Sequence, residues 1–130
     1  MSSKTEILTS LLEELSRASQ GNIQAALVIS RSQGLTICSY YPPNAPEGTV
    51  PQEDVIAGRC TQIQMATGKV FKELQRGPLV RMLIEGNDGY VIIGGAGEDA
   101  ILAVLTNRRV NLGYLFFMMS KIARQIAASL

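Results

Sequence analysis

The segment most suggestive of chemistry is IIGGAGED, residues 92–99, where a strand-like run enters three glycines. Glycine-rich loops bind phosphate when their amides open a helix, as in the GxxxxGK[ST] pattern, which also supplies a lysine. Here Glu98 and Asp99 follow the glycines, and another apolar run begins directly after them. Carboxylates repel phosphate and no helix is expected to start there. The segment therefore predicts a β-hairpin turn whose glycines supply positive φ angles.

The remaining reactive side chains form no recognisable catalytic or metal-binding set. The chain has no histidine, which removes the commonest general base and the commonest metal ligand. Glu98 and Asp99 are interpreted as a solvated turn, and Arg108 and Arg109 as exposed loop charge, with contact to a partner as the alternative. We therefore expect no catalytic residue, no metal and no cofactor, and an enzyme or small-ligand sensor is disfavoured.

Composition narrows the class of protein further. The chain has 130 residues, 46% of them hydrophobic, which predicts one compact domain over residues 1–130. Its net charge of +1 gives no indication of a nucleic-acid partner. Cys38 and Cys60 lie in apolar runs and are interpreted as buried free thiols. Without a signal-peptide pattern or an apolar run of ~18 residues, we expect a cytoplasmic protein with no membrane span.

Hydrophobic periodicity and turn residues predict eight elements in the order α-β-β-α-β-β-β-α. A proline- and glycine-rich loop, Pro42 to Val50, separates the first three from the rest, and its role is not apparent from the sequence. The expected helices cover residues 4–20, 51–75 and 112–129, the last capped by Asn111, and the expected strands cover residues 23–30, 35–41, 79–85, 90–94 and 100–106.

The expected sheet follows from its two most apolar strands. Residues 23–30 and 100–106 are apolar at nearly every position, which indicates cover on both faces. Joining the two hairpin blocks through these strands gives a five-stranded antiparallel sheet of order 2-1-5-4-3. Three helices then predict an α/β sandwich (α+β), with two helices on one face and one on the other.

The middle helix divides into three faces at ~100° per residue. We expect one face to cover the sheet: Ile56, Cys60, Ile63, Thr67, Val70 and Leu74. A second flank is charged and should contact solvent: Arg59, Gln62, Lys69 and Glu73. The opposite flank carries small residues that would let another helix approach closely.

An apolar edge strand and this small-residue flank together predict a symmetric dimer. The strand at residues 79–85 is long and hydrophobic for an edge, and such edges recruit other strands. Gly68 lowers the stability of the helix by roughly 1 kcal/mol relative to alanine. This cost would be explained if another helix packed closely against that position. The alternative is a solvated flank with an incidental glycine. The predicted interface consists of Ala57, Thr61, Gln64, Gly68, Phe71, Val80, Met82 and Ile84.

Four stretches of the sequence are similar to a known family. They are the entry SRASQGNIQAALVISRSQG, the passage ELQRGPLVRMLIEG, the strand DAILAVLT and the helix opening NLGYL. In this order and spacing they resemble the Roadblock family, named for its dynein light-chain members, over about Leu8 to Ile126. The resemblance implies the same five-stranded sheet between two helices and one, and a dimer formed through the third strand and the central helix.

The resemblance also implies a function. Roadblock members commonly act as partners and regulators of small Ras-like GTPases and are not self-contained catalysts. We therefore expect a dimeric regulator or scaffold of such a GTPase, as a homodimer or as a heterodimer with a related subunit. The alternative is a light-chain type of adaptor, for the dynein motor or the cytoskeleton, that binds a peptide or helix without nucleotide dependence.

Overall fold

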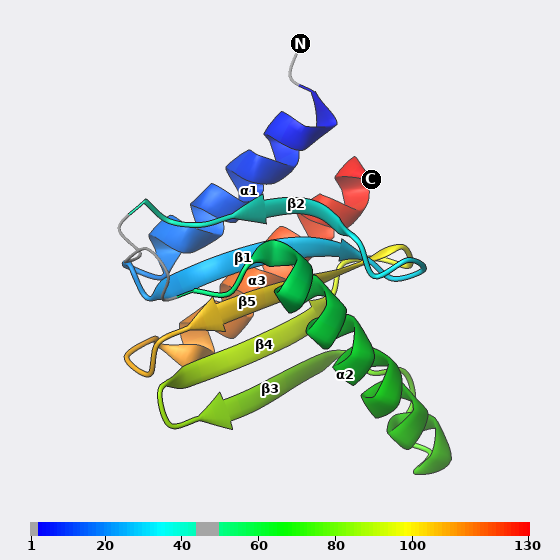
Figure 1. The fold of residues 1–130 in the computed structure, drawn as a ribbon. Helices are drawn as coiled ribbons and strands as arrows, with labels where there is room; N and C mark the ends of the chain where they lie inside the picture. The colour runs from blue at the N-terminus through cyan, green and yellow to red at the C-terminus, as the bar shows by residue number, and fades with distance from the viewer. Residues whose placement is uncertain (1–2, 44–49) are drawn as a thin grey trace.

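A computed structural model describes residues 3–43 and 50–130, so most of the Pro42 to Val50 loop lies outside the described residues. The element order confirms the prediction (Figure 1). The helices are α1 (Lys4–Ala18), α2 (Glu53–Glu73) and α3 (Leu112–Ser129). The strands are β1 (Ile23–Ser30), β2 (Thr36–Tyr40), β3 (Arg81–Gly86), β4 (Gly89–Gly95) and β5 (Ala100–Thr106).

The five strands form one antiparallel sheet of order β2-β1-β5-β4-β3, as predicted. β1 and β5 lie at its centre, where Leu27 faces Ala103 and Val28 faces Leu102. Strands β2 and β3 form the two edges.

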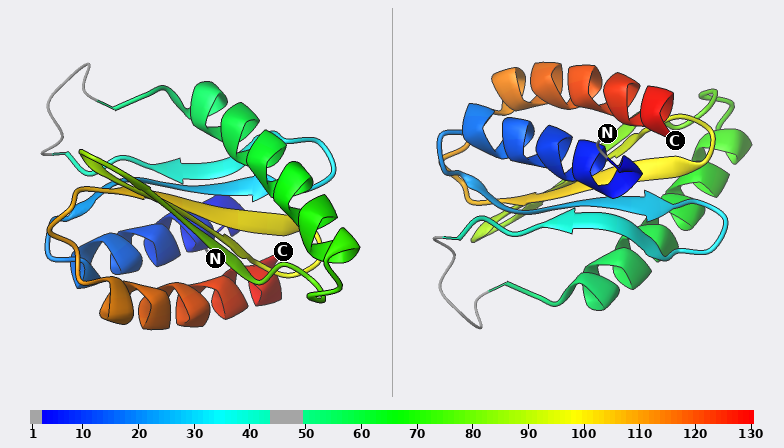
Figure 2. Two further views of the ribbon diagram at one scale, coloured as in Figure 1. Left: turned by 90° about the horizontal axis from the view of Figure 1, so that it is seen from below. Right: turned by 90° about the horizontal axis from the view of Figure 1, so that it is seen from above.

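The helices cover both faces of the sheet, again as predicted. α1 and α3 lie side by side on one face, and α2 crosses the other (Figure 2). Successive residues of β1 supply both layers: Val28 is buried in the α1–α3 cluster, while Leu27 and Ile29 are buried under α2. This alternation explains why β1 is apolar at almost every position.

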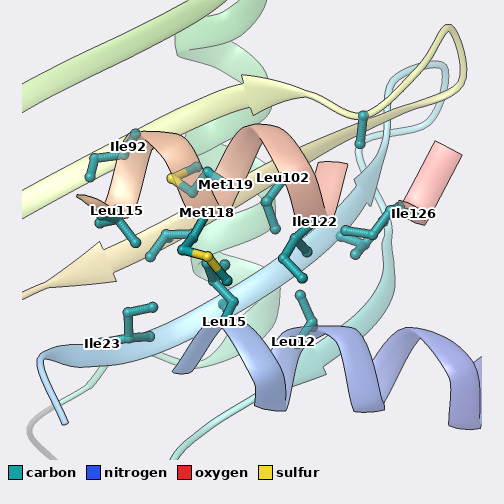
Figure 3. Close-up of a cluster of buried hydrophobic side chains, with 14 of the residues drawn as sticks. Leu12, Leu15, Ile23, Ile92, Leu102, Leu115, Met118, Met119, Ile122 and Ile126 are labelled. Atoms are coloured by element: carbon teal, nitrogen blue, oxygen red, sulfur yellow. The ribbon is translucent and has the colours of Figure 1, made fainter. Parts of the chain in front are cut away.

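The larger hydrophobic core lies between the sheet and the α1–α3 pair (Figure 3). Leu12 and Leu15 of α1 meet Ile122 and Ile126 of α3 over Leu102 of β5, and all five side chains are fully buried. Met118 of α3 belongs to the same core. Met118 is buried, whereas Phe117 is exposed.

Local chemistry determines where the outer helices start and stop. The Ser3 Oγ accepts a hydrogen bond from the Glu6 amide at 3.1 Å and caps α1. α1 ends at Ala18 and not at Gln20, because Gln20 and Gly21 have positive φ angles of 57° and 84°. The Asn111 side chain caps α3, as predicted. In the described part of the chain, no helix combines the length and apolarity that crossing a membrane requires.

Candidate protein-binding surface

The open edge of β3 presents unpaired backbone groups. The Gly95 amide donates to the Val80 carbonyl at 3.3 Å, and the register continues as Met82 opposite Ile93 and Ile84 opposite Val91. In an antiparallel pair such hydrogen-bonded positions alternate with positions whose backbone groups point the other way. The N–H and C=O groups of the intervening residues, Arg81, Leu83 and Glu85, therefore point outward along the edge.

The α2 face of β3 is only partly covered. Met82 and Ile84 point to this face and are half-buried, and the Thr67 hydroxyl donates to the Met82 sulfur at 3.4 Å. Val80, just before the strand, is 76% exposed. The edge strand thus carries apolar side chains beside its free backbone groups, the combination predicted from the sequence.

α2 contacts the sheet with only part of its length. At 1.5 Å per residue its 21 residues span about 31 Å, whereas five strands spaced ~4.8 Å apart are about 19 Å wide. The helix crosses the sheet obliquely and its last turns continue past the strand ends (Figure 1). Only Ile56, Ala57 and Cys60 of α2 are buried.

The predicted sheet-facing side of the middle helix is therefore partly wrong. Ile56 and Cys60 cover the sheet as expected and Thr67 is half-buried, but Ile63, Val70 and Leu74 are exposed, Leu74 by 60%. The C-terminal part of α2 extends beyond the sheet. The apolar residues of this part therefore have no strand to pack against, although they continue the predicted sheet-facing side of the helix. The charged flank is confirmed as exposed: Arg59, Gln62, Lys69 and Glu73.

The predicted interface residues on α2 lie nearer the sheet than expected. Ala57 is only 2% exposed and packs against β1 and β5, so its placement on an outward flank is wrong. Thr61, Gln64, Gly68 and Phe71 are half-buried. Sequence reasoning missed Val55 and Met65, which are exposed apolar residues of the same helix. The sequence did offer a signal for these two residues, because neither belongs to any of the three faces that were assigned to the middle helix.

A groove of about 600 Å³ separates the middle of α2 from the two turns at that end of the sheet. Thr61, Gln64 and Gly68 line it from the helix, and Arg31 and Glu98 from the turns. The Thr61 Oγ1 and the Gln64 Oε1 are buried without a hydrogen-bond partner in the described part of the chain. Buried polar atoms are normally paired, and both of these belong to residues that line the groove.

The glycine-rich segment leads into a hairpin turn, as predicted, but the prediction that its glycines supply positive φ angles is correct for one glycine and wrong for the other two. Gly94 and Gly95 are residues of β4, and only Gly97 has a positive φ, of 86°. The Ala96 amide donates to the Ala100 carbonyl at 2.9 Å and closes the turn. Strand β5 follows directly, so the segment does not open a helix.

The two loop arginines differ in their surroundings. Arg108 pairs with Glu85 at 2.8 Å and donates to the Gly86 carbonyl at 2.7 Å, which fixes the β3–β4 hairpin to the β5–α3 link. Arg109 is exposed. Within residues 3–43 and 50–130, no three His, Cys, Asp or Glu side chains come together as a metal site would require.

Both cysteines are buried free thiols, as predicted. The Cys38 sulfur lies 3.2 Å from the Thr9 hydroxyl. Burial between α2 and the sheet raises the pKa of the Cys60 thiol to about 11. A thiol that remains protonated is a poor nucleophile, so Cys60 is interpreted as a packing residue.

Comparison with known proteins places this geometry in a family. The model of the Roadblock/LC7 domain matches residues 9–106. The protein MJ1340 of Methanocaldococcus jannaschii is 32% identical over 106 residues, which are 82% of this chain and 86% of that protein. The protein MJ0310 of the same organism has the same identity and coverage.

Solved structures share the fold at lower sequence identity. The gliding protein MglB from Thermus thermophilus superposes with a TM-score of 0.88 at 22% identity, covering 99% of this chain and 92% of that one. MglB from Myxococcus xanthus gives a TM-score of 0.82 at 13% identity, covering 98% and 90%. A Roadblock/LC7 domain from Streptomyces avermitilis gives 0.72 at 17%, covering 87% and 91%. With its family match over most of its length, this fold and this sheet edge, the chain belongs to the Roadblock/LC7 domain family.

Proposed function

We propose that this protein is a non-catalytic, dimeric regulator or scaffold of small Ras-like GTPases. The observation that carries the proposal is the β3 edge, whose outward backbone groups lie beside exposed apolar residues in a Roadblock/LC7 chain. Regulation of small GTPases is a role that members of this family commonly have.

In the proposed dimer, β3 pairs with β3 of a second copy and extends the sheet across both protomers. The outward N–H and C=O groups of Arg81, Leu83 and Glu85 would gain partners, which an edge strand otherwise leaves to water. Val80, Met82 and Ile84 would be covered at the same time. A related subunit with a similar edge could replace the second copy.

The central helices complete the proposed interface. Thr61, Gln64, Gly68 and Phe71 line the half-buried flank of α2, where a partner helix would come close. Ala57 supports this flank from below by fixing α2 to the sheet. The exposed apolar residues Met65, Val70 and Leu74 are also left for a second molecule to cover, because α2 extends beyond its own sheet.

A broad, paired surface of this kind suits a G domain better than a small ligand. An interface of about 800 Å² on each partner would be ordinary for two globular proteins. The dimer can shift the conformation of the GTPase only if it binds the GDP-bound and GTP-bound states unequally. The proposal therefore requires nucleotide-dependent affinity.

Calorimetry against the small GTPases encoded in the same genome tests the proposal. Each GTPase is loaded with GDP or with a non-hydrolysable GTP analogue and titrated with the protein. We expect saturable binding to at least one GTPase, with different affinities for its two states. Absence of binding to all of them would contradict the proposal, and equal affinity for both states would favour the adaptor alternative.

A further inference from the structure

A second groove lies on the opposite face of the sheet, between α3 and the β3–β4 edge, and has a volume of about 350 Å³. Its floor is apolar and consists of Leu102 from β5 with Met119 and Ala123 from α3. It shares two residues with the proposed dimer interface, Val80 and Arg81, and Arg81 takes part in that interface through its backbone groups. The function of the groove does not depend on GTPase binding.

The groove exists because position 94 has no side chain. Gly94 of β4 faces Leu102 of β5, two residues from Ile92, which is buried in the α1–α3 core. A Cβ atom at Gly94 would meet only the Val80 carbonyl oxygen, at an ordinary 3.9 Å. Its φ is not positive, so the backbone does not require glycine. A side chain would fit here, and its absence leaves the floor open.

Two arginines line this groove, and none of the described residues that line it is acidic. Arg81 comes from β3 and Arg124 from α3, and both are exposed. The Arg81 guanidinium lies 4.2 Å from the centre of the Phe116 ring, a cation–π contact that orients it. Within the described residues, neither arginine forms an ion pair with a carboxylate. The groove thus combines an apolar floor with two cations available for an external anion.

We propose that this groove binds an acidic peptide segment of a partner protein. Its carboxylates would pair with Arg81 and Arg124, because a guanidinium matches a carboxylate with two parallel hydrogen bonds. Its aliphatic side chains would lie on Leu102, Met119 and Ala123. A recessed floor suits inserted side chains better than a lipid headgroup layer, and two cations are too few for a nucleic-acid backbone.

Fluorescence anisotropy with three labelled synthetic peptides tests the specificity. One alternates Glu with Leu, the second Lys with Leu, and the third Glu with Ser. We expect saturable binding of the Glu–Leu peptide only, weakened by added salt. Equal binding of the Lys–Leu peptide, or no saturable binding of the Glu–Leu peptide, would overturn the proposal.

Two kinds of variant locate the binding. Arg124→Glu should weaken the Glu–Leu peptide by roughly ten-fold or more, as loss of a charge-assisted contact predicts. Arg59→Glu makes the same charge change on α2, across the sheet, and should leave affinity unchanged. Gly94→Val fills the groove without changing charge and should abolish binding, with Gly94→Ala intermediate.

Light scattering and circular dichroism establish that each variant keeps the assembly and fold of the parent protein. Equal losses in Arg124→Glu and Arg59→Glu would show non-specific attraction and overturn the proposal. So would full affinity in a folded Gly94→Val protein. Vesicles containing phosphatidylserine serve as a further probe. If they bind through Arg124 while no peptide does, the occupant is a membrane surface and the proposal is wrong.

Discussion

At the scale of single residues, two glycines of α2 form a natural comparison. Among the described residues, a Cβ atom at either Gly58 or Gly68 would meet nothing within 4 Å apart from its own stretch of helix backbone. Neither glycine is therefore required by contacts within the chain. Any difference between them must come from what approaches the helix from outside.

Alanine substitution at these positions tests the proposed helix contact. Gly58→Ala should raise the free energy of unfolding by about 1 kcal/mol, because alanine favours the helix. Gly68→Ala should stabilise an isolated protomer equally but weaken the dimer, because the added methyl group separates the two helices. Urea denaturation and analytical ultracentrifugation measure the two effects. Equal behaviour of the two variants in both measurements would contradict close approach at Gly68.

The Cys60 thiol makes stability depend on alkaline pH. Its pKa of about 11 in the folded protein lies above the ordinary value of 9.0, so the unfolded chain loses this proton first as the pH rises. The stabilisation is intact below about pH 9 and is lost as the pH approaches 11. In Cys60→Ala this part of the decline should disappear, as measured by urea unfolding at about pH 8 and about pH 10. An unchanged decline would exclude Cys60 as its source.

At the scale of elements, hydrophobic periodicity predicted the type of each element and its apolar side, but not how much of its length contacts the rest of the protein. β1 and β5 could be placed at the centre of the sheet because continuous apolarity reports cover on both faces. The stripe on α2 was equally clear, yet Val70 and Leu74 are exposed because the helix extends beyond the sheet. The length of the contact depends on the crossing angle, which no local pattern encodes. The groove between α3 and the β3–β4 edge could not be predicted from the sequence either, because it is formed by strands and a helix that are distant in sequence.

Two aliphatic residues of α2 should therefore differ in their effect on stability. Ile56→Ala removes a buried side chain and should cost about 2–4 kcal/mol of the free energy of unfolding. Leu74→Ala should change protomer stability by less than about 0.5 kcal/mol, because the residue is exposed. Urea denaturation at low protein concentration makes the comparison. Similar losses in the two variants would mean that α2 packs along its whole length.

At the scale of the whole molecule, the β3 edge decides whether the protein acts alone or in pairs. The direction of the backbone amides along β3 predicts different effects for proline at two adjacent residues, Met82 and Leu83. The Met82 amide points to β4, whereas the Leu83 amide points outward. Proline at either position removes a backbone N–H donor. At Met82 the lost hydrogen bond is the one to β4 of the same protomer, and at Leu83 it is the one proposed to reach the second protomer.

Leu83→Pro should give a folded monomer, and Met82→Pro a destabilised protomer that aggregates. Multi-angle light scattering gives the mass of each variant, and circular dichroism gives its fold. A Leu83→Pro protein with the mass of the parent dimer would contradict assembly through β3. A monomeric parent protein would contradict the dimer itself.

The central pairing of β1 with β5 has a consequence for synthesis on the ribosome. Ile23 faces Thr106 across this pair, so the first of the five strands must wait for the last one to be synthesised. At ~5–20 residues per second, the nascent chain spends several seconds with one side of β1 unpaired. During that interval one of the two most apolar strands of the protein is open to chaperones and to neighbouring nascent chains. Slowing translation downstream of β1 should therefore increase misfolding, even though the finished protein is unchanged.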